Sequence, residues 1–171
     1  TRAVIINSPS NPTGVVYTES ELRAFAAILE KHPDIWIISD DIYAKLIYDG
    51  GKFFNLAMLS EKLRDRVIIA DGLSKAFSMT GWRLGYAVST NAGLIKALEK
   101  IQGQSTSNAT SFAQYGAVAA LNGDHAFIER MNAAFVERRD YLVETLGKMP
   151  GIRVFKPTGA FYIFPDIAEL A

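Results

Sequence analysis

A lysine and an arginine closely follow one short apolar run of the chain. Lys75 lies just after the run 67–70, and Arg83 lies further along the same polar segment. Burial and nearby positive charge favour the neutral amine of a lysine, which is a nucleophile toward carbonyl groups. Arg83 can supply that positive charge, or its planar guanidinium can hold a phosphate. The pair indicates covalent chemistry at a carbonyl, phosphate binding, or both.

Three more polar side chains stand after other apolar runs. Asn11 follows the run 3–6, and Asp40 and Tyr43 follow the run 35–38. A carboxylate that points into a crevice needs a cationic partner, and the protonated ring nitrogen of pyridoxal phosphate is one candidate. The Asn11 amide and the Tyr43 hydroxyl can then hydrogen-bond to a ring hydroxyl.

Each of these residues also has a purely structural interpretation. Lys75 can be an exposed surface lysine, Asp40 a helix cap, and Arg83 the partner of an acidic side chain. The tetrapeptide 11–14, Asn-Pro-Thr-Gly, consists entirely of residues that favour turns. The elements around these residues therefore decide between the two interpretations.

Four short apolar runs predict the strands that position these residues. Each is too short and too rich in β-branched residues for a helix, and none alternates apolar with polar residues, so we expect strands buried on both faces. The runs are 3–6, 35–38, 67–70 and 85–88. A helix is expected between the first two, because Thr18 and Glu21 have the spacing of a capping box.

Strand, helix and strand in this order predict the α/β class. We expect a mostly parallel sheet with helices on both faces. Ligands of such sheets bind in the crevice at the carboxyl ends of the strands. If the strands are parallel, Asn11, Asp40, Tyr43 and Lys75 converge on one edge of the sheet.

After residue 90 the pattern becomes helical, with three helices and a change of domain. Apolar residues at helical spacing mark helices near 94–101, 112–121 and 127–146. We place a domain boundary after residue 123, which gives domains 1–123 and 124–171. In the second domain we expect the charge run 137–140 to be solvated, and we expect two strands at 152–155 and 160–164.

Composition excludes several classes of function. Lys and Arg total 18, and Asp and Glu also total 18. The chain therefore has no excess of positive charge that would attract nucleic acid or a membrane surface. It has no Cys and 2 His, so we expect neither disulfides nor a metal site. No apolar run is long enough to span a membrane and no signal-peptide pattern is present, so a cytoplasmic location is expected.

Four ordered motifs resemble class I/II aminotransferases, which are fold-type I enzymes that use pyridoxal phosphate. The segment 72–85, GLSKAFSMTGWRLG, is similar to the family's cofactor-attachment signature. The segment 11–14, the pair Asp40 and Tyr43, and the segment 157–162, PTGAFY, match further family motifs in the same order. The resemblance covers essentially the whole chain.

The resemblance implies a role for each candidate residue. Lys75 forms the internal aldimine with pyridoxal phosphate and moves a proton between the substrate α-carbon and the cofactor. Asp40 pairs with the pyridine nitrogen, whereas Tyr43 and Asn11 bind the ring oxygen. Arg83 binds the phosphate. The catalytic set is therefore Lys75, Asp40 and Tyr43.

The chain also departs from the family pattern. Gly72 stands where some members have a phosphate-binding serine, which makes Ser74 a substitute candidate. The family's upstream phosphate loop, its stacking aromatic ring and its arginine for the substrate carboxylate have no counterpart in this sequence. We therefore expect a partial segment, the carboxyl-terminal part of the large domain plus the beginning of the small one.

By resemblance, the implied activity is transfer of an amino group between an amino acid and a 2-oxo acid, in a homodimer. Aspartate, alanine and aromatic amino acids all remain open as substrates. One alternative is another fold-type I reaction, as in a β-lyase or a cyclopropane-carboxylate synthase. Another is a non-catalytic fragment or regulatory module.

Overall fold

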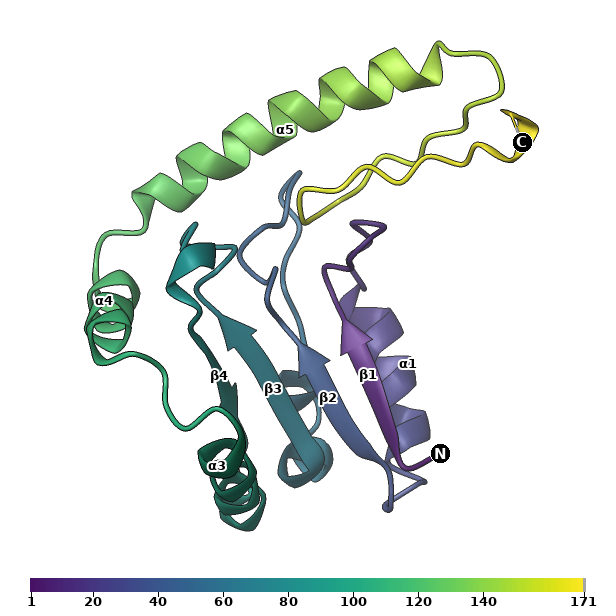
Figure 1. Cartoon of the computed structure of the whole chain (residues 1–171). Helices are drawn as coiled ribbons and strands as arrows, with labels where there is room; N and C mark the ends of the chain where they lie inside the picture. The colour runs from purple at the N-terminus through teal and green to yellow at the C-terminus, as the bar shows by residue number, and fades with distance from the viewer. Residues whose placement is uncertain (171) are drawn as a thin grey trace. The chain divides into compact units, whose positions relative to one another are not determined.

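The structure, a computed structural model, describes residues 1–170, which divide into two compact units (Figure 1). The first unit contains residues 1–7, 17–42 and 54–124. The second unit contains residues 8–16 and 43–53 and the chain from His125 onward. The expected domain boundary after residue 123 stays a prediction.

The first unit is built on a mixed sheet that is mostly parallel. Within the described residues its strands are β1 (Ala3–Asn7), β2 (Trp36–Asp40), β3 (Val67–Gly72) and β4 (Gly85–Val88), in that spatial order. The pairs β1–β2 and β2–β3 are parallel, whereas β3–β4 is antiparallel. The predicted α/β class and the predicted strands are confirmed.

Helix α1 (Glu19–Leu29) begins at the predicted capping box. The Thr18 hydroxyl accepts a hydrogen bond from the Glu21 N–H at 3.3 Å, and Glu21 Oε2 accepts one from the Thr18 N–H at 2.8 Å. These bonds satisfy backbone donors that a helix start otherwise leaves without partners. The Thr18 hydroxyl also lowers the pKa of Glu21.

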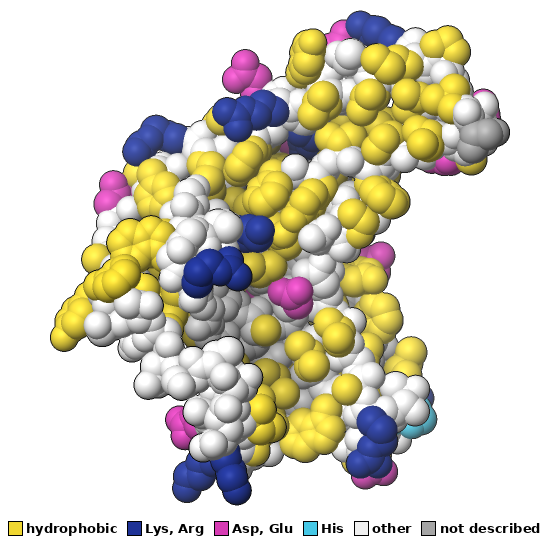
Figure 2. Space-filling view, in the orientation of Figure 1, with side chains coloured by type: hydrophobic (Ala, Val, Ile, Leu, Met, Phe, Trp, Pro, Cys, Tyr) yellow, Lys and Arg dark blue, Asp and Glu magenta, His cyan; other side chains and the backbone are white. Residues whose placement is uncertain are grey.

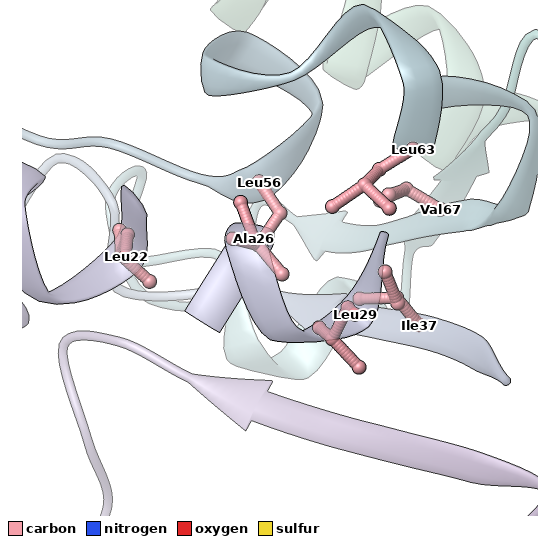
Figure 3. Packing of buried hydrophobic residues seen from close by; sticks show 7 residues of the cluster. All are labelled: Leu22, Ala26, Leu29, Ile37, Leu56, Leu63 and Val67. Atoms are coloured by element: carbon pink, nitrogen blue, oxygen red, sulfur yellow. The ribbon is translucent and has the colours of Figure 1, made fainter. Parts of the chain in front are cut away.

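The hydrophobic core of the first unit lies on one face of the sheet. Helix α1 packs there together with the short helix α2 (Leu56–Leu59) and the 3-10 helix η1 (Glu61–Arg66), neither of which the sequence analysis anticipated. Figure 3 shows the buried side chains of this core, which are Leu22, Ala26, Leu29, Ile37, Leu56, Leu63 and Val67. This core holds β2 and β3, and therefore the ends of both strands, in place.

The expectation that all these strands are buried on both faces is wrong for β1 and β4. In β1, Val4 and Ile6 pack against the core, but Ile5 points to the opposite face and is 66% exposed. All residues of β4 are exposed, since this strand pairs antiparallel at the edge of the described sheet. Figure 2 likewise shows hydrophobic side chains at the visible surface, between charges of both signs.

The three predicted helices are present. Helices α3 (Ala92–Ser105) and α4 (Ser111–Asn122) belong to the first unit, and α5 (Ala126–Gly147) belongs to the second. Asn91 caps α3, because its side-chain oxygen accepts a hydrogen bond from the Leu94 N–H at 3.0 Å. In the described part of the chain, no helix combines the length and the apolar character that crossing a membrane requires.

The two strands expected at 152–155 and 160–164 do not form. Arg153 makes an isolated bridge with Asp166, and Gly159 makes another with Ile47. Around the second expected strand, Gly159 and Ala160 bond instead to the loop 43–53, which lies far away in the sequence. The expectation of two strands is therefore wrong, because local sequence does not reveal this distant partner.

The capping box yields a direct test of the folding of α1. We expect Thr18→Ala to lower the free energy of unfolding by about 1 kcal/mol, because one N–H loses its acceptor. Thr18→Ser keeps the hydroxyl and serves as the matched control. Urea unfolding followed by circular dichroism measures both, and equal midpoints for wild type and Thr18→Ala would contradict the role of the cap.

Candidate active site

Asp40 lies at the carboxyl end of β2, at the centre of the parallel strands. In the sheet register it pairs with Asn7 of β1 and Ala70 of β3. The Asn7 side-chain amide donates a hydrogen bond to the Asp40 carbonyl oxygen at 3.3 Å, and the Ile42 N–H lies 3.5 Å from Asp40 Oδ1. The carboxylate thus sits at the sheet edge where the sequence analysis expected a site.

The next residue, Asp41, is a buried support for this position. Its carboxylate accepts hydrogen bonds from the Ser39 hydroxyl at 2.6 Å and from the Asn55 amide at 2.7 Å. Its N–H donates to the Ala70 carbonyl at 2.9 Å. Burial raises the pKa of Asp41, although the two side-chain donors oppose that change. Asp41 therefore fixes the backbone immediately after Asp40.

Two of the predicted phosphate ligands line one cavity in the first unit. Its volume is about 190 Å³, and it is lined by Ile42, Gly72, Ser74, Arg83, Leu84 and Gly85. Ser74 and Arg83 are linked through Thr80, whose hydroxyl donates to the Ser74 carbonyl at 3.0 Å and whose carbonyl accepts from Arg83 Nη1 at 3.2 Å. Ser74 and the exposed Arg83 therefore line the same small cavity.

The backbone around this cavity requires small side chains and one strained residue. A Cβ atom on Gly72 would lie 3.0 Å from the Leu84 carbonyl oxygen and 3.1 Å from the Gly85 Cα. Glycine therefore fits where a serine would crowd the antiparallel neighbour. Arg83 has a left-handed backbone, with φ at 52°, directly after the 3-10 helix η2 (Thr80–Trp82). This turn presents its guanidinium at the cavity.

Lys75 lies in the turn that follows β3, next to Ser74. It is half-buried between the buried residues Leu73 and Ala76, and its carbonyl accepts a hydrogen bond from the Ser78 N–H at 3.1 Å. The turn keeps the lysine close to the carboxyl end of β3, which pairs with β2 where β2 carries Asp40.

Tyr86 supports the same strand end, and the sequence analysis gave it no role. Its hydroxyl donates to Asp71 Oδ2 at 2.9 Å across the β3–β4 pair, and Asp71 Oδ1 accepts from the Gly72 N–H at 2.6 Å. Burial and the Asp71 carboxylate raise the pKa of Tyr86 to about 12. Tyr86 therefore remains a neutral donor that holds Asp71.

Asn11 and Tyr43 belong to the second unit. Asn11 lies in the loop 8–16. In this loop the Gly14 carbonyl accepts hydrogen bonds from the Thr158 and Gly159 N–H groups of the segment 157–162. Tyr43 is 3% exposed, and its hydroxyl forms a hydrogen bond with the Tyr162 hydroxyl. Both residues therefore lie on segments that contact 157–162.

The structure thus places the predicted site residues in two groups. Asp40, Ser74, Lys75 and Arg83 lie on the carboxyl side of β2 and β3 in the first unit. In the second unit, Tyr43 bonds to Tyr162 of the segment 157–162, and Asn11 lies on the loop 8–16, whose Gly14 bonds to that segment.

One residue that the sequence analysis placed in solvent is buried. Arg139 belongs to the charge run 137–140 but is 4% exposed. Its position on α5 indicates burial, because it shares helical spacing with apolar residues of one stripe. These residues are Phe135, Leu142 and Leu146. Arg139 therefore occupies a position in the apolar stripe, and the expectation of a wholly solvated charge run is wrong.

Comparison with characterised proteins relates this chain to aminotransferases. It is 49% identical, over all 171 residues, to an aspartate aminotransferase of Bacillus subtilis, of which it covers 43%. It is 46% identical to an asparagine–oxo-acid transaminase of Streptococcus mutans, with 99% of this chain and 42% of that protein covered. The chain thus spans less than half the length of these relatives.

Comparison with solved structures also relates this chain to aminotransferases. The crystal structure of an aspartate aminotransferase from Rhizobium meliloti matches 98% of this chain and 42% of its own, with a TM-score of 0.95 and 40% identity. The model of the family "Aminotransferase class I and II" matches residues 1–171. The chain belongs to the aminotransferase class I and II family.

Proposed function

We propose that this chain forms part of an aminotransferase that moves an amino group between an amino acid and a 2-oxo acid. The family to which it belongs depends on pyridoxal phosphate. The observation that carries the proposal is the cavity that Ser74 and Arg83 line after β3, with Lys75 directly following Ser74 in the chain. Hydrogen-bond donors for a phosphate and an amine that can attack a carbonyl thus lie within the short segment 74–83.

The residues present fit the phosphate of this cofactor. The Arg83 guanidinium offers charged N–H donors, and the Ser74 hydroxyl offers a neutral one. Gly72 has no side chain, and a Cβ atom there would press against Leu84 and Gly85, which also line the cavity. We therefore propose Arg83 as the main phosphate ligand and Ser74 as the second.

The remaining candidates fit the ring and the reaction. When bound, pyridoxal phosphate supplies an electron sink that stabilises negative charge at the substrate α-carbon. Asp40 would accept a hydrogen bond from the ring nitrogen and keep it protonated. Asn11 and Tyr43 would donate hydrogen bonds to the ring oxygen. Lys75 would hold the cofactor covalently through its amine and carry the proton to and from the substrate α-carbon.

For the substrate, we propose an amino acid with an acidic or amide side chain. The support comes from relatives named aspartate aminotransferase, asparagine–oxo-acid transaminase and aspartate/prephenate aminotransferase, at 45–49% identity. Small molecules of this kind need no basic surface, in agreement with the balanced charge of the chain. A homodimer and a cytoplasmic location are further proposals, and they rest on the family resemblance and the sequence.

A chimera tests the proposed activity. The matching 171 residues of the Bacillus subtilis aspartate aminotransferase are replaced by this chain, and amino-group transfer from aspartate to a 2-oxo acid is measured. We expect activity in the chimera and its loss in the Lys75→Ala form. Lys96→Ala, at an exposed position on α3, is the control and should retain activity. A stable, cofactor-loaded chimera with no transfer activity would contradict the proposal.

The phosphate role of Arg83 yields a second test. Arg83→Gln should weaken binding of pyridoxal phosphate by roughly 10-fold to 100-fold, the loss expected for one charge-assisted hydrogen bond. Binding of pyridoxal, which lacks the phosphate, should stay unchanged. Arg23→Gln, at an exposed position on α1, is the matched control. If equilibrium dialysis shows that Arg83→Gln loses equal affinity for both compounds, Arg83 does not bind the phosphate.

A further inference from the structure

Arg139 is a buried cation in the second unit, and four hydrogen bonds tie its guanidinium to the protein. Its Nη1 and Nη2 donate to the two carboxylate oxygens of Asp49 at 2.7 and 3.0 Å. Nη1 also donates to the Pro157 carbonyl at 3.1 Å, and Nε donates to Asp140 at 2.8 Å. The guanidinium lies over the Tyr48 ring, 5.3 Å from its centroid. These contacts make Arg139 a structural connector.

These contacts join three segments that are far apart in the sequence. Arg139 lies on α5, Asp49 on the loop 43–53, and Pro157 at the start of the segment 157–162, which runs beside α5 (Figure 1). The Arg139 guanidinium lowers the pKa of Asp49, so the pair stays ionised at neutral pH. The fork geometry fixes direction as well as distance, because two parallel hydrogen bonds leave little rotational freedom.

The two joined segments also bond directly to each other. The Tyr48 N–H donates to the Thr158 carbonyl at 2.9 Å, and the Ala160 N–H donates to the Leu46 carbonyl at 2.9 Å. The Tyr48 hydroxyl donates to the Ala160 carbonyl. At Gly159 the backbones are so close that a Cβ atom would lie 2.8 Å from the Leu46 carbonyl oxygen.

The paired segments end in two tyrosines whose hydroxyls meet. Tyr43 begins the loop 43–53 and Tyr162 ends the segment 157–162, and the two hydroxyls share a hydrogen bond. Their rings stand edge to face, with centroids 5.6 Å apart and planes at 77°. The position of the Tyr43 hydroxyl therefore depends on the register between these segments.

We propose that Arg139 is a positioning residue for Tyr43. Through Asp49 and the Pro157 carbonyl it sets the register of the two segments, and this register sets the Tyr43–Tyr162 hydroxyl pair. The consequence for the reaction rests on the proposed function, in which Tyr43 binds the ring oxygen of the cofactor. The positioning itself does not depend on that function and can be tested without cofactor.

The test uses the 171-residue chain with ¹³Cζ-labelled tyrosine, observed by NMR. Tyr43→Phe and Tyr162→Phe assign the two signals and show the shift of each tyrosine when it lacks its partner. In Arg139→Lys the charge remains but the fork is lost. We expect the Tyr43 and Tyr162 signals to move toward those unpaired positions, whereas Tyr17 and Tyr86 of the first unit and the helix content stay unchanged.

Arg130→Lys is the matched control, since Arg130 is an exposed arginine on the same helix and its replacement should leave all tyrosine signals in place. Asp49→Asn, which keeps the guanidinium in place, is a second route to the same change if Arg139→Lys loses helix content. Folded Arg139→Lys with unchanged Tyr43 and Tyr162 signals would overturn the proposal. So would general unfolding, with every tyrosine shifted, in both Arg139→Lys and Asp49→Asn.

Binding of pyridoxal phosphate separates this proposal from the proposed function. If wild-type chain binds the cofactor, Arg139→Lys should weaken binding by about 10-fold, a loss typical of a small displacement of a positioning group. Arg130→Lys should bind as wild type does. If wild type does not bind, the proposed function fails for this chain, and the tyrosine signals still decide whether Arg139 positions Tyr43.

Discussion

The parallel register of β1, β2 and β3 is the constraint on which the first unit depends. It aligns Asn7, Asp40 and Ala70 at one level of the sheet, so the chain leaves each strand at the same edge. The antiparallel return of β4 brings Gly85 beside Gly72 and closes the cavity that Ser74 and Arg83 line. A shift of β2 by one residue against its neighbours would turn the Asp40 side chain to the core face. The apolar core on α1, α2 and η1 holds the register against such a slip.

Each unit also contains a buried ionisable side chain that forms hydrogen bonds within the protein. Asp41 accepts from Ser39 and Asn55 beside Asp40, and Arg139 donates to Asp49 and the Pro157 carbonyl. Burying a charge without partners is costly, so such a group holds its partners in one arrangement. In both units it supports a residue proposed to touch the cofactor, Asp40 in the first and Tyr43 in the second.

Local patterns predicted much of this fold, and non-local contacts account for what they missed. The strands, the capping box at Thr18 and the three later helices follow from short-range spacing, and the cofactor-attachment motif pointed to Lys75. The antiparallel direction of β4 depends on its partner strand, and the pairing of 157–162 with the loop 43–53 joins distant parts of the chain. The burial of Arg139 was visible as a gap in the apolar stripe of α5, but its charge suggested solvent. Only the presence of Asp49 and the Pro157 carbonyl makes that position suitable for arginine.

Lys75 is the lysine that we propose holds the cofactor. The most direct measurement incubates the chain with pyridoxal phosphate, reduces the product with borohydride and maps the labelled peptide by mass spectrometry. Label confined to Lys75, and absent after Lys75→Ala, is the expected result, because the neighbouring phosphate donors favour reaction at this amine. Label spread over many lysines in proportion to their exposure, with Lys75 no more reactive than Lys96, would contradict the assignment.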